Sequence, residues 1–193
     1  MAIHTQYRTQ AVEIMDDFSL EGEELREALD KIASINKLLG GNKLTLQGIK
    51  KLLKETDETK TITIVDVGCG NGDMLRLMAD FANKNNYTFQ LIGIDANAFT
   101  IEHARLLSKE YATISYRCED IFSEAFTEVK YDILLCTLTL HHFKNEEIDT
   151  ILNVFQKQAS LGIVINDLHR SKLAYRLFQL VCSVFQLNRM SRE

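Results

Sequence analysis

The sequence contains no proline, no long apolar run, no CxxC pair and no cluster of basic residues. A membrane span needs about 18 apolar residues in a row, and a secretory leader needs a basic stretch followed by an apolar one, so neither is expected. Scattered lysines and arginines with a formal net charge of −5 argue against a nucleic-acid partner. We therefore expect a cytoplasmic protein that acts on a small molecule or contacts another protein. We have no physical account of the missing proline.

The few cysteines also exclude a class of site. The four cysteines stand apart in the chain, and none has the Cys/His spacing of a metal centre. We expect reduced thiols that pack as small apolar side chains, and no bound metal. With 193 residues, of which 46% are hydrophobic, the chain is long enough for one domain with a substantial core.

The hydrophobic pattern changes near Thr61. Before it, residues 20–39 and 45–55 carry apolar side chains at helical spacing. After it, short β-branched runs alternate with amphipathic helical segments, which predicts parallel strands joined by crossover helices. The expected fold is α/β, a doubly wound, Rossmann-like sheet, with residues 1–60 as a helical extension or lid and residues 61–193 as the main domain. The predicted strands are residues 61–67, 88–95, 113–120, 131–140 and 161–168, and a last helix is predicted at 172–185.

The stretch "VDVGCGNGD", from Val65 to Asp73, joins the first predicted strand to a helix. Gly68, Gly70 and Gly72 allow a sharp turn that brings backbone N–H groups and the positive end of the helix against a ligand. In a doubly wound sheet the ligand crevice lies beyond the carboxyl ends of the strands, where this loop is expected. A tight strand-to-helix turn without a ligand would also satisfy the pattern.

Two neighbouring strand ends favour a ligand that contains adenosine. Asp95 ends the second strand, 23 residues after Gly72, near the spacing of a carboxylate that binds both ribose hydroxyls. Asp120 and Ile121 follow the third strand and offer a carboxylate and an apolar contact for an adenine ring.

The spacing of the glycines and the local charge separate two kinds of adenosine ligand. The dinucleotide fingerprint is G-x-G-x-x-G, and here Asp73 stands where that fingerprint needs its third glycine. Asp66 adds a second carboxylate just before the loop. Negative charge at close range disfavours a pyrophosphate and favours a sulfonium and an ammonium group.

The combination of "VDVGCGNGD", Asp95, "ED" at 119–120 and "YDILLCTLTLHHF" resembles the class I methyltransferases that use S-adenosylmethionine. The resemblance covers about residues 61–168 and implies S-adenosylmethionine as the cofactor. Carried over by motif, it implies that Asp66 and the loop hold the methionine part, Asp95 the ribose, and Asp120 with Ile121 the adenine. Thr137 or Leu138 would line the side that bears the methyl group. The full implied set is Asp66, Gly68, Cys69, Gly70, Asn71, Gly72, Asp95, Ala96, Asp120, Ile121, Thr137 and Leu138.

Catalysis of methyl transfer needs mainly positioning, because the sulfonium already activates the methyl group. A base is needed only when the acceptor must lose a proton, and His142 and His169 follow the fourth and fifth predicted strands. Either histidine could instead orient the acceptor without moving a proton. The stretch "NDLHRSKLAYRLF" resembles small-molecule methyltransferases, which implies a hydroxyl of a phenolic, quinoid or polyketide-like acceptor. The alternatives are a noncatalytic module of the same fold and, less favoured, an NAD-dependent oxidoreductase.

The family pattern continues with two more strands than this sequence provides after residue 168. An open sheet edge and a broadly apolar helix at 172–185 would then need a cover. We therefore expect a shortened methyltransferase domain whose helix and edge are buried against a second copy, which forms a homo-oligomer, or against another partner.

Overall fold

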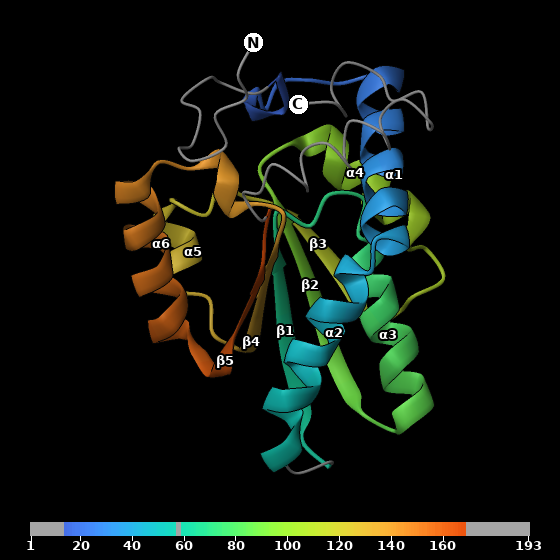
Figure 1. Cartoon of the computed structure of the whole chain (residues 1–193), viewed down its shortest axis with the longest axis vertical. Coiled ribbons are helices and arrows are strands. Elements are labelled where there is room, and N and C mark those ends of the chain that lie inside the picture. Colours follow the sequence, from blue (N-terminus) through green and yellow to red (C-terminus); the bar gives the residue numbers. More distant parts are fainter. Residues whose placement is uncertain (1–13, 57–58, 169–193) are drawn as a thin grey trace.

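In the described part of the chain, five parallel strands form one sheet in the order β3-β2-β1-β4-β5 (Figure 1). The computed structural model describes residues 14–56 and 59–168 of the chain. The direction of winding reverses between β1 and β4, which places a ligand crevice beyond their carboxyl ends. The strands are β1 (Thr61–Val67), β2 (Thr88–Asp95), β3 (Ile114–Cys118), β4 (Tyr131–Thr137) and β5 (Ala159–Asn166).

Local sequence sets where several helices begin. The side chain of Asn97 accepts a hydrogen bond from the N–H of Thr100 at 2.8 Å and thereby caps the first turn of α4. The α-helices are α1 (Glu23–Leu38), α2 (Gly41–Leu52), α3 (Asp73–Asn85), α4 (Ala98–Leu107), α5 (Glu124–Thr127) and α6 (Asn145–Gln158). Short 3-10 turns form η1 (Ile14–Asp16), η2 (Leu53–Glu55) and η3 (Leu140–His142).

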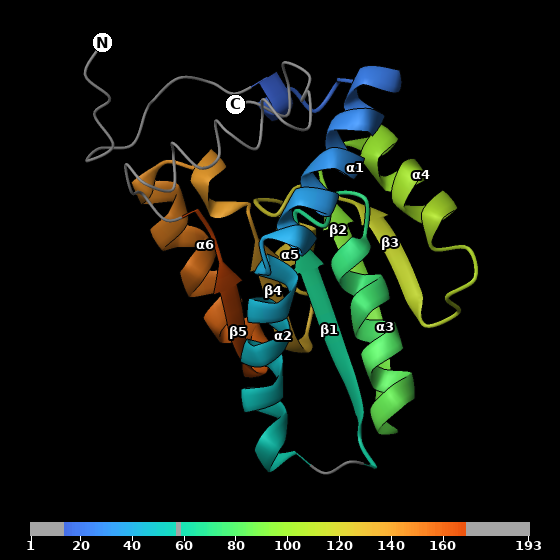
Figure 2. The ribbon, with the colours of Figure 1, turned by 45° about the vertical axis from the view of Figure 1, so that its right-hand side comes forward.

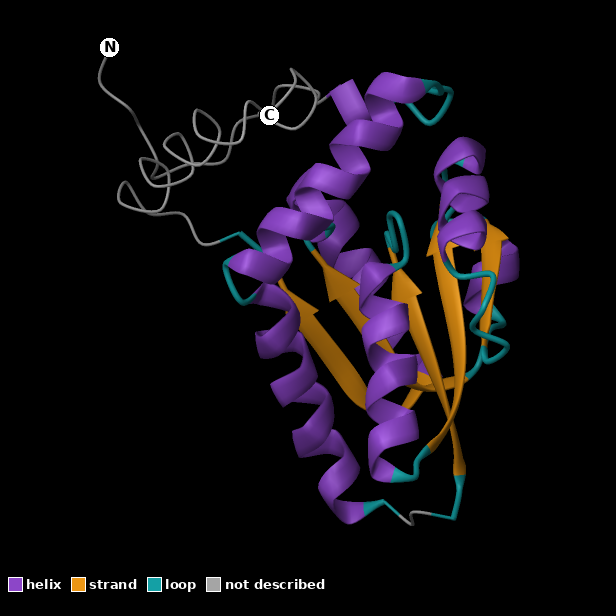
Figure 3. Cartoon of the chain, turned by 90° about the vertical axis from the view of Figure 1, so that its right-hand side faces the viewer, coloured by secondary structure: helices purple, strands orange, loops and turns teal. Residues whose placement is uncertain are grey.

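Helices cover both faces of the sheet. On one face α2, α3 and α4 bury an apolar cluster against β1, β2 and β4, and this layer stands in front of the sheet in Figure 3. On the other face α5 and α6 bury a second cluster around Phe126 and Phe155, whose rings meet edge to face. Helix α1 packs on α2 and α4, at the end of the molecule toward which the strands point (Figure 2). This arrangement confirms the predicted fold class, an α/β sheet of parallel strands with helices ahead of it.

Several boundaries differ from those predicted from the pattern. The fourth strand ends at Thr137 and not at residue 140, because Leu138 takes a left-handed conformation with φ 54° and turns the chain into η3. Helix α6 passes directly into β5, so the fifth strand spans 159–166. Helix α2 begins at Gly41, earlier than residue 45. The predicted helix at 172–185 lies outside the described residues.

Crossing a bilayer would require a longer and more apolar helix than any found in the described part of the chain. The division of the chain at residue 60 stays a prediction.

Candidate functional site

The loop after β1 is held open by three glycines in the left-handed region, with φ of 65° at Gly68, 51° at Gly70 and 78° at Gly72. A Cβ at Gly68 would lie 2.3 Å from the hydroxyl of Thr139, and one at Gly72 would lie 2.0 Å from that of Tyr116. Packing alone therefore requires glycine at both outer positions.

The middle glycine has a different environment. A Cβ at Gly70 would approach only Leu29 of α1, at 3.8 Å. A side chain at Gly70 would therefore make only ordinary contact with one side chain of α1, so packing crowds this position less than Gly68 and Gly72. The less crowded position fits close approach of a ligand to the main chain.

Three carboxylates surround the loop. Asp66, at the end of β1, is 2% exposed, and burial together with the charges of Asp73 and Asp95 raises its pKa well above the ordinary value of 3.8. Burial also raises the pKa of Asp95, although hydrogen bonds from the N–H groups of Asn97 at 3.0 Å and Gly70 at 3.2 Å oppose the shift. A cationic ligand would relieve this concentration of buried negative charge, whereas a pyrophosphate would add to it. The donor set therefore fits a sulfonium and an ammonium group.

The same carboxylates keep the neighbouring thiol neutral. Burial and the charges of Asp95 and Asp66 raise the pKa of the Cys69 thiol well above its ordinary value. The backbone N–H of Cys69 donates to the carbonyl oxygen of Ile94 at 3.1 Å, which ties the loop to β2. The main chain of Cys69 therefore holds the loop in place, and its contact with a cofactor stays a prediction.

The other strand ends lie along the same edge of the sheet. Asp120 is exposed and accepts a hydrogen bond from the N–H of Phe122 at 2.9 Å, while Ile121 is 9% exposed. The Thr137 hydroxyl lies 3.4 Å from that of Thr45 in α2. The fold thus brings the predicted strand-end residues to one edge, and their contacts with a cofactor stay predictions.

Two histidines whose rings lie in tilted contact follow β4. The ring centroids of His141 and His142 are 4.2 Å apart. The Nδ1 atom of His141 lies 2.7 Å from Oδ1 of Asp167, and that of His142 lies 2.8 Å from Oδ1 of Asp16. Burial would raise the pKa of Asp167, but its hydrogen bond with His141 and the charge of that ring lower it below the ordinary value.

The helices before the sheet contribute polar contacts that the sequence reasoning missed. In α1, Oδ1 of Asp30 lies 2.8 Å from both Nδ2 of Asn71, in the glycine loop, and Nε2 of His103, in α4. In α2, Asn42 donates to Asp73 at 2.7 Å. The one sequence signal for these contacts is a polar residue within a helical pattern, and that pattern does not name its partner.

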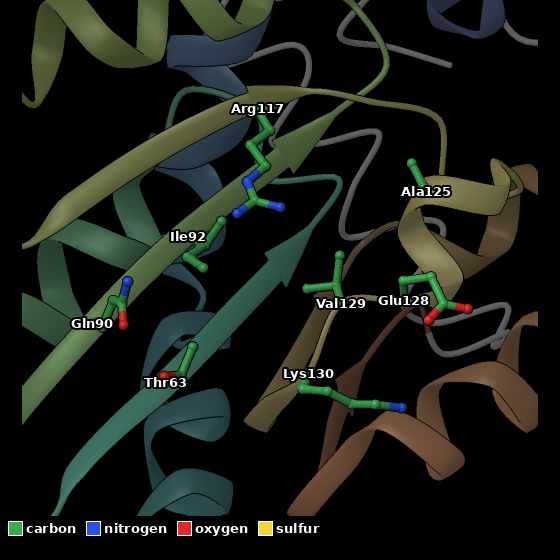
Figure 4. Close-up of a pocket in the computed structure, with 8 residues that line it drawn as sticks. All are labelled: Thr63, Gln90, Ile92, Arg117, Ala125, Glu128, Val129 and Lys130. Carbon is green, nitrogen blue, oxygen red and sulfur yellow. The ribbon is translucent and has the colours of Figure 1, made fainter.

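Two further observations concern where the candidate site lies. His169, the other predicted catalytic residue, lies outside the described residues. A hollow of about 450 Å³ opens on the second sheet face beside the short helix α5 (Figure 4), and it contains none of the predicted site residues. Its lining is Thr63, Gln90, Ile92, Arg117, Ala125, Glu128, Val129 and Lys130. We place the candidate site at the glycine loop, where the buried carboxylates and strand ends meet.

The family described as Methyltransferase domain matches residues 64–162, and the chain belongs to it. Membership confirms the family indicated by the motif resemblance. The match runs from the middle of β1 to the first part of β5 and so includes the loop, Asp95 and both histidines of η3.

Curated relatives share part of this sequence. The ubiquinone biosynthesis O-methyltransferase of Rickettsia typhi is 29% identical over 141 residues, which are 72% of this chain and 54% of the relative. The protein with the same name in Rickettsia canadensis is 28% identical over 130 residues, 67% of this chain and 52% of the relative. The chain spans about half the length of these relatives.

Solved structures share the fold. The magnesium protoporphyrin IX methyltransferase of Synechocystis with bound SAH (S-adenosylhomocysteine) aligns with a TM-score of 0.55 at 16% identity, over 76% of this chain and 64% of that chain. The plantazolicin methyltransferase BpumL in complex with SAH aligns with a TM-score of 0.54 at 21% identity, over 88% and 66%. At these identities the likeness shows the fold alone.

Proposed function

We propose that this chain binds S-adenosylmethionine at the carboxyl edge of its sheet and transfers the methyl group to a hydroxyl of a phenolic, quinoid or polyketide-like small molecule. The observation that carries the proposal is the loop at Gly68–Gly72, least crowded at Gly70 and surrounded by Asp66, Asp73 and Asp95. The curated relatives named O-methyltransferases support the choice of a hydroxyl acceptor.

The cofactor-binding roles follow from charge and position. Asp66 and the loop backbone would hold the cationic methionine part, because the buried carboxylates favour positive charge there. Asp95 has one oxygen toward the N–H of Gly70 and the other toward that of Asn97, and each oxygen can accept a further bond from a ribose hydroxyl. Asp120 would accept from the adenine amino group beside Ile121.

The cofactor supplies a methyl group already activated on a sulfonium, so the protein's part is to align the acceptor and exclude water. A phenol-type hydroxyl must also lose its proton as the new bond forms. His142, in η3 at the end of β4, is the described residue that we assign to accept that proton.

Isothermal titration calorimetry with SAH tests the binding half of the proposal. Asp95→Ala removes a charge-assisted acceptor and should weaken binding by roughly 1.5 to 3 kcal/mol, about 10- to 150-fold. Asp149→Ala, an exposed carboxylate on α6, is the matched control and should leave the affinity unchanged. Thermal unfolding of both variants checks that they fold.

The outcomes separate the alternatives. Equal affinity in wild type and Asp95→Ala would remove Asp95 from the ribose site, and binding of NAD in place of SAH would point to an oxidoreductase. Binding of SAH without turnover, across a panel of phenolic and quinoid acceptors with labelled methyl donor, would identify a noncatalytic module.

A further inference from the structure

The contact between η1 and η3 joins two parts of the chain that the sequence separates widely. Oδ1 of Asp16 lies 2.8 Å from Nδ1 of His142, and both side chains are partly exposed, at 27% and 25%. Asp16 is part of a helical turn that lies before the sheet, whereas His142 ends the segment that follows β4. An acidic side chain from the N-terminal segment thus reaches the residue assigned above as the base.

The position of His142 is fixed by its own segment. The N–H of His142 donates to the carbonyl oxygen of Thr139 at 3.2 Å, and the Thr139 hydroxyl lies 3.0 Å from the carbonyl oxygen of Thr137 and 3.3 Å from that of Val67. The N–H of Leu138 donates to the carbonyl oxygen of Asn166 at 2.8 Å. These bonds tie η3 to the ends of β1 and β5. The backbone that carries the His142 ring is therefore held in a defined position.

The charged groups around His142 favour one arrangement of its ring proton. Asp16 faces Nδ1, the tilted ring of His141 lies against that of His142 and is itself held by Asp167, and Asp95 interacts with His142 electrostatically. A carboxylate can only accept hydrogen bonds, so a neutral imidazole beside Asp16 carries its proton on Nδ1 and its lone pair on Nε2. An imidazole without such a partner can place the proton on either nitrogen.

We infer that Asp16 is a positioning residue that fixes the Nδ1-protonated tautomer of His142 and so makes Nε2 the base for the acceptor hydroxyl. The inference rests on the proposed function, in which His142 accepts the acceptor proton. In the step, the O–H proton passes to Nε2, the oxygen electron pair forms the bond to the methyl carbon, and the carbon–sulfur pair returns to sulfur. The charge of Asp16 stabilises the imidazolium that results.

A consequence concerns the N-terminal segment. Because Asp16 belongs to η1, the base has its correct tautomer when η1 is seated on η3. Seating of the segment that precedes α1 is thereby coupled to the chemistry at the end of β4.

The test compares Asp16→Asn with Asp17→Asn in the full chain. The side chain of Asp17 is exposed and bonds locally to Ser19, so Asp17→Asn changes the same charge in the same segment without a bond to His142. Asp16→Asn should lower kcat at least tenfold with KM nearly unchanged, because an amide can present N–H to Nδ1 and favour the wrong tautomer. Asp16→Glu keeps the carboxylate and should restore part of the lost kcat, and Asp17→Asn should resemble wild type.

A second measurement does not depend on turnover. The ¹⁵N chemical shifts of the His142 ring, assigned with His142→Gln, should report a protonated Nδ1 in the wild-type protein and a shift of the proton toward Nε2 in Asp16→Asn. An unchanged tautomer, or an unchanged kcat in Asp16→Asn, overturns the inference. Equal kcat in wild type and His142→Gln overturns it as well, because no base is then needed at this position. Failure of SAH to bind would instead contradict the proposed function, while the tautomer measurement would still decide whether Asp16 orients the ring.

Discussion

Some residues in and around the loop after β1 are required for packing, and others are assigned to ligand binding. Gly68 and Gly72 are required by the close approach of Thr139 and Tyr116, while a Cβ at Gly70 would approach only Leu29 of α1, at 3.8 Å. The burial of Asp66 is unfavourable for its charged form, and the charges of Asp73 and Asp95 add to the cost. The loop therefore holds negative charge where a cationic ligand is expected, at the expense of stability without that ligand.

We expect the free energy of unfolding of the ligand-free protein to fall as the pH rises, because Asp66 loses its proton. The pKa of Asp66 is raised in the folded state, so the folded protein binds its proton more tightly than the unfolded chain does. The free energy of unfolding should then fall above about pH 4 and level off once the pH passes the raised pKa. Asp66→Asn should remove the part that Asp66 contributes and leave a flatter profile in urea unfolding between pH 4 and 8, with the raised pKa of Asp95 accounting for part of the slope that stays.

Asp132 offers a control for that experiment, because its pKa is shifted in the opposite direction. Burial would raise the pKa of Asp132, but hydrogen bonds from Ser160, Lys60 and the N–H of Thr63 lower it overall. Its contribution to stability is present above the ordinary value of 3.8 and is lost as the pH falls through the lowered pKa. Asp132→Asn should therefore destabilise most at neutral pH. Identical pH profiles for wild type and Asp66→Asn would contradict the assignment of the raised pKa.

At the scale of elements, helix α1 is tied to the cofactor loop by one side chain. Asp30 accepts hydrogen bonds from Asn71 in the loop and from the buried ring of His103 in α4. Three segments distant in sequence meet at this carboxylate. Helix α1 therefore takes part in shaping the loop, in addition to covering the sheet end.

We expect Asp30→Ala to weaken binding of SAH several-fold although Asp30 is assigned no contact with the ligand. Loss of the shared acceptor leaves Asn71 and the buried His103 without this partner, which should also cost about 1 to 3 kcal/mol of stability. Calorimetry measures the affinity, and amide hydrogen exchange at residues 68–72 measures opening of the loop. Glu27→Ala, which removes only an exposed pair with Lys31, is the control. If amide exchange at residues 68–72 is as slow in Asp30→Ala as in wild type, α1 does not hold the loop closed.

At the scale of the whole molecule, the edge of the sheet at β5 is a candidate surface for association between chains. Within the described residues β5 pairs with β4 alone, and Ile165 and Leu168 are 43% and 62% exposed. Unpaired strand edges with apolar side chains favour association between chains. The self-association predicted from the sequence remains a proposal for this edge.

We expect light scattering behind a sizing column to find an oligomer that Ile165→Lys dissociates, because a lysine on an edge strand opposes pairing with another strand. Leu106→Lys, at a 63% exposed position on α4, should leave the oligomer intact. A wild-type monomer at all concentrations would reject association through this edge.

The sequence by itself determined the alternation of strands and helices, the place of the glycine loop and the carboxylates at the strand ends, because periodicity and turn residues act over a few neighbouring positions. Tertiary structure alone decided that Leu138 would end β4 early, that α6 would pass into β5, and that Gly68 and Gly72 would serve packing. It also decided the partners of Asp16, Asp30 and Asn42, since these contacts join residues far apart in the chain. A polar residue in a helical pattern shows that a partner is needed, and only the packed fold determines which one it meets.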